Sequence, residues 1–213
     1  MKGKLARSAY QHIEEHRSLY LFVTVLFLMG IVFGAIVVNS LSLTQKHDLY
    51  MYLNQFFGQV SEGSYATASD MFKQSFSHYA KYAGLMWLLG LSVIGLPFIL
   101  LLLFLKGIVV GFTVGFLVNQ MGIPGFAMSF VSVLPQNLIV VPVYIFVAAI
   151  SLAFSLKLIR HQFLKTNYEP IFPMFMKSCL FMAVSIMLLA FASSIEAFLS
   201  PSLMKIIIDW TAG

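Results

Sequence analysis

The sequence has 213 residues, of which 60% are hydrophobic and only 10% are charged, and its mean hydropathy is +0.89. Soluble domains carry charged side chains at about a quarter of their positions, so this composition excludes an ordinary soluble domain and predicts a polytopic membrane protein. The formal net charge is +5, and the single cysteine, Cys179, excludes an intrachain disulfide. No nucleic-acid-binding motif accompanies the basic residues, so we interpret the positive charge through the membrane and expect no nucleic-acid partner.

The first hydrophobic run, Tyr20–Leu41, is long enough to cover about 30 Å of hydrocarbon as a helix. A cleavable signal peptide has an apolar region of only about 7–15 residues followed by small residues. This run is longer and ends in Val-Asn-Ser, which favours an uncleaved anchor. The basic tail before it, residues 1–18, predicts a cytoplasmic N-terminus, because lysine and arginine remain on the cytoplasmic side.

Four further apolar runs predict an all-α bundle of five transmembrane helices, a single integral membrane domain over residues 1–213. They are Gly84–Leu105, Gly107–Met121, Leu138–Leu156 and Cys179–Leu199. Lys106 separates two of them. A lysine inside the bilayer costs about 2.5–3.5 kcal/mol, so we expect Lys106 in a cytoplasmic loop. Nine lysines and arginines then lie on the cytoplasmic side and four on the external side. Four of the nine are in a cytoplasmic basic loop at 157–177, and the C-terminus is external. A four-span chain would place that basic loop outside.

The predicted third span is short, since Gly107–Met121 reaches only about 22 Å as a helix. Glycines and prolines interrupt the chain after it, between Gly122 and Asn137. Such broken apolar segments line polar notches in some membrane proteins, and a simple external turn is the alternative. The pattern leaves open whether residues 126–134 re-enter the bilayer.

The segment 42–81 is the one sizeable non-membrane part, and it predicts two external amphipathic helices. Apolar residues share one face of the first: Leu49, Tyr52, Leu53, Phe56, Phe57 and Val60. Thr67 followed by Asp70 predicts the N-cap of the second, which we expect to continue into the next span. Its aromatic face includes Phe72 and Phe76. Three roles are open for these faces: packing on the spans, docking of a partner, or contact with lipid. Our partner-interaction candidates are Phe56, Phe57, Phe72, Phe76, Pro135, Gln136 and Asn137.

Glycine rows predict close helix packing within the bundle. Gly30 with Gly34, and Gly107 with Gly111 and Gly115, each follow the small-xxx-small spacing that lets two helix backbones approach. Part of this surface could join copies of the chain into a homo-oligomer, since sequence alone does not assign the facing helix.

No residue pattern supports an enzyme. The segment His12–His16 formally matches H-x-x-E-H, a metalloprotease pattern, but it has no third ligand nearby and no pocket that would exclude water. We therefore expect no metal, no cofactor and no catalytic residue. Glu196 is the one acidic residue in a predicted span, and we expect it at the external interface, with no charge at the membrane midplane.

Several segments of the chain resemble the stage II sporulation protein M family. They are YLFVTVLF from Tyr20, GIVFGAIVVNSL from Gly30, DLY from Asp48, QFF from Gln55 and LPQNLIVVP from Leu134. The length and the five-span layout are also similar, so the resemblance covers essentially the whole chain. Relatives in the wider family tend to carry Pro-His-Gly and a following glutamate where this chain has Pro135-Gln136-Asn137, so an activity of those residues does not transfer.

The resemblance implies a role in endospore formation, in which the mother-cell membrane migrates around the forespore during engulfment. Such proteins act with two peptidoglycan-degrading partners, stage II sporulation proteins D and P. The resemblance implies a non-enzymatic scaffold in the septal membrane. A small transporter or channel subunit is the alternative from a different class.

Overall fold

The computed structural model describes residues 10–61, 67–163 and 171–212, and every regular element within these ranges is a helix. A short helix at residues 10–15 precedes the labelled ones. The others, in chain order, are α2 (Arg17–Ser40), α3 (Leu43–Ser61), α4 (Ala68–Gly90), α5 (Gly95–Met121), α6 (Ile123–Ser132), α7 (Leu134–Phe163), α8 (Ile171–Phe198) and α9 (Ser200–Ala212).

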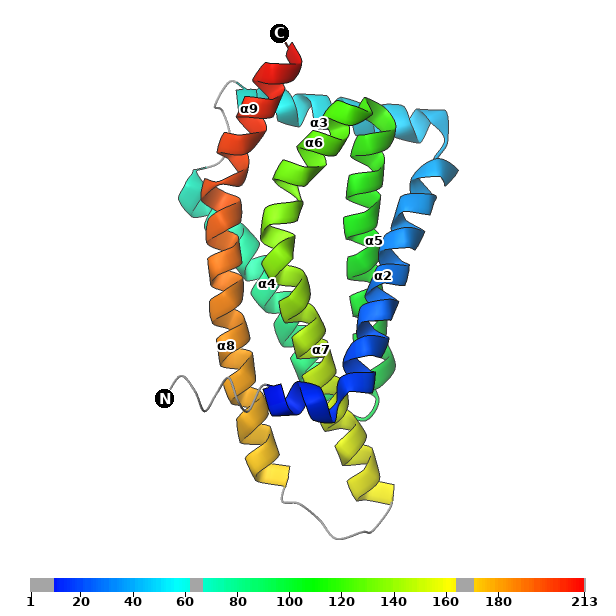
Figure 1. Ribbon diagram of the computed structural model, residues 1–213, viewed down its shortest axis with the longest axis vertical. Coiled ribbons are helices and arrows are strands. Elements are labelled where there is room, and N and C mark those ends of the chain that lie inside the picture. The colour runs from blue at the N-terminus through cyan, green and yellow to red at the C-terminus, as the bar shows by residue number, and fades with distance from the viewer. Residues whose placement is uncertain (1–9, 62–66, 164–170, 213) are drawn as a thin grey trace.

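The long helices run along one common direction, and α3 lies across one end of them (Figure 1). The short N-terminal helix crosses the bundle near the opposite end, where α7 and α8 extend furthest. The described residues give four helical stretches long and apolar enough to cross a membrane: Arg17–Ser40, Gly95–Met121, Leu134–Arg160 and Phe172–Ile206. The chain is therefore a multi-pass, all-helical membrane protein.

The predicted boundaries of the second and third spans were wrong. The run Gly84–Leu105 is divided between α4, which ends at Gly90, and α5, which begins at Gly95. The turn between them is itself apolar, so hydropathy does not reveal it. Pro97 falls in the first turn of α5, where a proline needs no backbone N–H. Lys106 consequently lies in the middle of a continuous 27-residue helix, and the short third span does not exist.

Helix α4 begins where the sequence predicts. The Thr67 hydroxyl accepts a hydrogen bond from the Asp70 backbone N–H at 3.3 Å and donates one to the Asp70 carboxylate at 2.6 Å. This cap satisfies backbone groups of the first turn. The helix then continues without a break through Tyr79, Ala83 and Met86, which are buried against the bundle. The helix therefore continues into the apolar run that begins at Gly84, as expected, but it ends at Gly90.

The chain reverses at Gly122, whose φ of 61° falls in the left-handed region that favours glycine. Helix α6 follows directly and packs against α5. The backbone at Val133 remains helical, so α6 leads into α7 without an intervening loop, although the two helices differ in direction (Figure 1). Residues 126–134 therefore belong to α6, which turns back along α5, and to its junction with α7.

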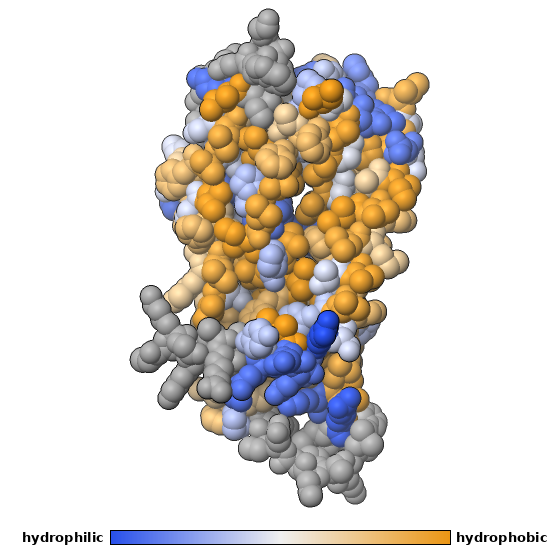
Figure 2. Space-filling model, viewed as in Figure 1, coloured by the Kyte–Doolittle hydropathy of each residue, from blue (hydrophilic) through white to orange (hydrophobic). Residues whose placement is uncertain are grey.

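Helix α7 forms the centre of the bundle. In its most apolar stretch 67% of the residues are buried, against 22–39% in the other three stretches. Tyr144 and Val147 of α7 belong to one buried core cluster with residues from α2, α4, α5 and α8. The outer surface is apolar over the middle of the molecule (Figure 2), as expected for helices that face lipid.

Candidate functional site

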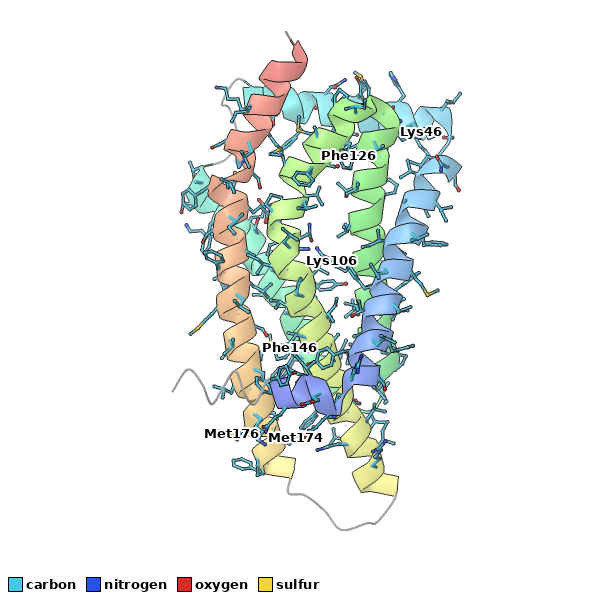
Figure 3. The ribbon with its side chains drawn as sticks, in the orientation of Figure 1. Lys46, Lys106, Phe126, Phe146, Met174 and Met176 are labelled. Carbon is cyan, nitrogen blue, oxygen red and sulfur yellow. The ribbon has the colours of Figure 1, made fainter. Side chains whose placement is uncertain are left out.

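A polar cluster inside the bundle forms around Lys106, which our sequence analysis had placed in a loop. The Lys106 ammonium lies 5.5 Å from the ring centroid of Tyr79 and 5.6 Å from that of Tyr144. Both distances fit a cation–π contact. Figure 3 shows Lys106 at mid-height of the bundle, between α5 and α7. The expectation that no charge lies near the midplane was therefore wrong.

Glu196 on α8 supplies the opposite charge. Its carboxylate accepts a hydrogen bond of 2.7 Å from the Tyr79 hydroxyl, and its charge acts on Lys106. The Tyr144 hydroxyl lies 3.4 Å from the Tyr79 carbonyl oxygen. Glu196 is half-buried against α4, so its expected role as a solvated interfacial residue does not hold.

The cluster explains why α5 tolerates a lysine. A charge inside the membrane is costly unless a partner of opposite sign or aromatic faces replace its hydration. Tyr79 is on α4, Tyr144 on α7 and Glu196 on α8, so these three groups meet Lys106 only after the helices pack. The sequence signal that could have pointed to the cluster is the coincidence of one lysine, one glutamate and two tyrosines in otherwise apolar runs.

The predicted glycine faces of α2 and α5 meet each other. A Cβ atom added at Gly34 or Gly111 would collide with backbone atoms of the facing helix, at Ile108 and Ile31 respectively. Gly30 and Gly107 also face each other, and a Cβ added at Gly115 would lie 3.1 Å from the Ala35 Cα atom. These five glycines therefore face the contact between α2 and α5 within one chain.

Helix α3 presents several of its large apolar side chains to the outside. Tyr52 is 73% exposed and Phe56 is 44% exposed, whereas Leu49 and Leu53 are half-buried. The side chain of Phe57 lies outside the described residues. The predicted stripe thus splits, with one part turned toward the rest of the molecule and one part accessible at the end of the bundle.

The two partner-interaction candidates on α4 are less accessible. Phe72 and Phe76 are both half-buried, and their rings stack with centroids 5.8 Å apart. They lie in the first half of α4, before the buried Tyr79. Packing accounts for much of their surface.

The three candidates Pro135, Gln136 and Asn137 lie at the junction of α6 and α7, where the two amide side chains hydrogen-bond to nearby backbone. Gln136 is buried; its amide nitrogen donates to the Ser132 carbonyl, and its oxygen lies 3.5 Å from the Ser200 hydroxyl. Asn137 donates to the Val133 carbonyl at 2.7 Å. Both side chains donate to carbonyl groups where α6 ends, next to the half-buried Pro135. Gln136 therefore links α7 to α9, while Asn137 lines a cavity between α2, α5, α6 and α7 whose other lining residues are mostly apolar.

His12 and His16 of the H-x-x-E-H segment stack on each other, with ring centroids 4.5 Å apart. Within residues 10–61, 67–163 and 171–212, no group of three His, Cys, Asp or Glu side chains is arranged to hold a metal ion. The two rings contribute instead to the contact between the N-terminal helix and α8, where His12 meets Phe181 at 6.0 Å between centroids.

Comparison with known protein families shows a match to Stage II sporulation protein M over residues 23–201. The matched region runs from the first turns of α2 into the first turn of α9 and so includes the polar cluster and all five glycines. The chain belongs to the stage II sporulation protein M family. No curated protein and no solved structure matches the chain. Membership of this family makes it a sporulation-related membrane protein.

Proposed function

We propose that this protein is a non-enzymatic scaffold of forespore engulfment that holds peptidoglycan-degrading partners at the septal membrane. Family membership supports the sporulation setting. The observation that carries the scaffold role is the exposed apolar surface of α3, which includes Leu43, Met51, Tyr52 and Phe56 at one end of the bundle. Exposed aromatic and apolar side chains at a membrane surface suit a partner contact.

The proposed orientation places α3 outside the cell. In this arrangement α4 crosses the membrane as a fifth, more polar helix, because it runs from below α3 to the turn with α5 near the N-terminal helix (Figure 1). Lys106 and Lys81 lie in the middle of α5 and α4 and belong to neither side. By their place in the sequence, eight lysines and arginines then belong to the segments at the N-terminal end, and three, Lys46, Lys73 and Lys205, to those at the α3 end. That bias favours a cytoplasmic N-terminus and an external α3. The wall-degrading partners act on that same external side.

The partners that the family resemblance suggests are stage II sporulation proteins D and P. Co-purification of the tagged full-length protein from membranes of sporulating cells tests the contact. Tyr52→Asp adds a charge to the exposed α3 surface, and we expect it to lower partner recovery at least tenfold. Thr44→Asp adds the same charge at an exposed position in the first turn of α3 and is the matched control. Equal recovery with both variants would count against α3 as the contact surface.

A small transporter or channel subunit is the second candidate function. The specific observation in its favour is the pair of ionisable residues inside the bundle, Lys106 and Glu196, since such residues often mark ion or substrate pathways. Flux of ions or solutes into liposomes that contain only the purified protein would support it. Absence of flux together with partner recovery that depends on Tyr52 supports the scaffold.

A further inference from the structure

A cavity of about 370 Å³ opens where the short N-terminal helix crosses α7 and α8. Figure 2 shows hydrophilic side chains gathered at this crossing, below the apolar middle of the molecule. Three separate segments contribute to its wall, with His12 from the N-terminal helix, Lys157 from α7 and Lys177 from α8. None of the functions considered above uses this cavity.

The polar wall of the cavity is positively charged at neutral pH. Lys157 and Lys177 come from different helices, and both act electrostatically on His12. Burial and the neighbouring His16 lower the pKa of His12 to about 4, so His12 is neutral at pH 7. Among the described residues of the wall Glu15 is the one acidic side chain, so two lysines outweigh one carboxylate there. An anion with a single negative charge matches this balance.

The same cavity also has an apolar lining. Phe154 lies one turn from Lys157 on α7, and Met174 and Phe181 lie one turn to either side of Lys177 on α8. Figure 3 shows Met174 near the end of α8, beside the N-terminal helix. A small hydrophilic anion would leave these side chains in contact with water. An amphiphile would cover them while its charged group met the lysines.

We propose that this cavity binds one anionic phospholipid, with the phosphate between Lys157 and Lys177 and the first part of an acyl chain against Phe154 and Phe181, which lie one turn nearer the apolar middle of the bundle. Basic pockets between transmembrane helices at the membrane surface are suited to such headgroups. The site lies at the other end of the bundle from α3 and does not depend on the scaffold role. It would fasten the N-terminal helix to α7 and α8 through the lipid.

Native mass spectrometry of the full-length protein in detergent micelles tests this, with phosphatidylglycerol as the anionic lipid and phosphatidylcholine as the zwitterionic reference. We expect tight binding of one phosphatidylglycerol. Since a basic residue near a membrane surface contributes about 1 kcal/mol, Lys157→Gln and Lys177→Gln should each weaken it about fivefold. Arg160→Gln removes an exposed charge one turn from Lys157 and outside the cavity wall, so it should leave binding unchanged.

A second pair of variants leaves every charge in place. Met174→Trp fills the apolar side of the cavity and should abolish binding, whereas Met176→Trp enlarges an exposed neighbour that does not line it. Thermal unfolding confirms that each variant is folded. Equal weakening by Arg160→Gln and Lys157→Gln would show a diffuse charge effect and overturn the site. Displacement of the lipid by inorganic phosphate at similar concentration would overturn the lipid assignment.

Discussion

The Tyr79 hydroxyl donates a 2.7 Å hydrogen bond to the Glu196 carboxylate, while the ring of the same tyrosine lies 5.5 Å from the Lys106 ammonium. One side chain of α4 thus contacts opposite charges from α5 and α8. Tyr79 is buried, and it joins two groups that neither helix could keep alone in a membrane. This arrangement predicts energetic coupling between residues 106 and 196.

Removal of either charge should destabilise the bundle. Lys106→Met leaves Glu196 without its cation, and Glu196→Gln leaves Lys106 without its anion, so each should lower the free energy of unfolding by about 3 kcal/mol. The double variant should cost clearly less than the sum, because no unpaired charge remains. Unfolding by denaturant in mixed micelles measures all three. Lys205→Met, at an exposed position of α9, is the control and should change little.

Additive effects of Lys106→Met and Glu196→Gln would mean that the two charges do not interact. In that case the tyrosines alone would have to accommodate the lysine.

The contact between α2 and α5 predicts opposite effects for the same substitution at two glycines. Gly111→Ala adds a Cβ that would collide with the Ile31 backbone, so the two helices must separate and stability should fall by about 1–3 kcal/mol. Gly84→Ala adds a Cβ into open space on α4 and should leave stability unchanged or raise it by up to about 1 kcal/mol. Thermal unfolding in detergent compares the two. A loss at Gly84 equal to that at Gly111 would refute the packing argument.

Cysteine accessibility decides whether α4 crosses the membrane. In a Cys179→Ser background, we expect Thr44→Cys at the start of α3 to react with an impermeant maleimide added outside intact cells. Ser92→Cys in the turn between α4 and α5, and Arg160→Cys on α7, should react only after the membrane is opened. All three positions are exposed. External labelling of Ser92→Cys would leave only four crossings.

The sequence predicts the parts of this fold that depend on one segment at a time. The length of α2, the helix α3 and the Thr67 cap of α4 all follow from local pattern, because each is decided by residues within a few turns. The family resemblance was likewise confirmed by the match over residues 23–201.

Prediction failed where the deciding groups come from other helices. The cost of Lys106 in the bilayer argued for a loop, and only the packed bundle reveals Tyr79, Tyr144 and Glu196 around it. The turn at 91–94 was missed for a different reason, because Leu91, Val93 and Ile94 are apolar and hydropathy continues through them. The same holds for Gln136, which appears as a polar notch residue in sequence and is buried against α9 in the structure.

The contact of the N-terminal helix with α8 predicts a stability that falls in mild acid. Burial, with a smaller contribution from His16, lowers the pKa of His12 from 6.5 to about 4, while Glu15 opposes this and Lys157 and Lys177 add to it. Above pH 6.5 His12 is neutral whether or not the protein is folded, so the full contribution of His12 to the free energy of unfolding is present. Between pH 6.5 and 4 the unfolded chain binds the proton more readily, and stability should fall as pH falls.

Two measurements check this expectation. An NMR titration of the His12 ring in micelles should give a midpoint near pH 4, and Phe181→Ala, which uncovers the ring, should move it toward 6.5. The unfolding temperature of the wild-type protein should decline between pH 6.5 and 4 more steeply than that of His12→Gln, which has no proton to bind there. A wild-type midpoint of 6.5, or identical pH profiles for the two proteins, would show that the ring is solvated and that the N-terminal helix does not rest on α8 through this residue.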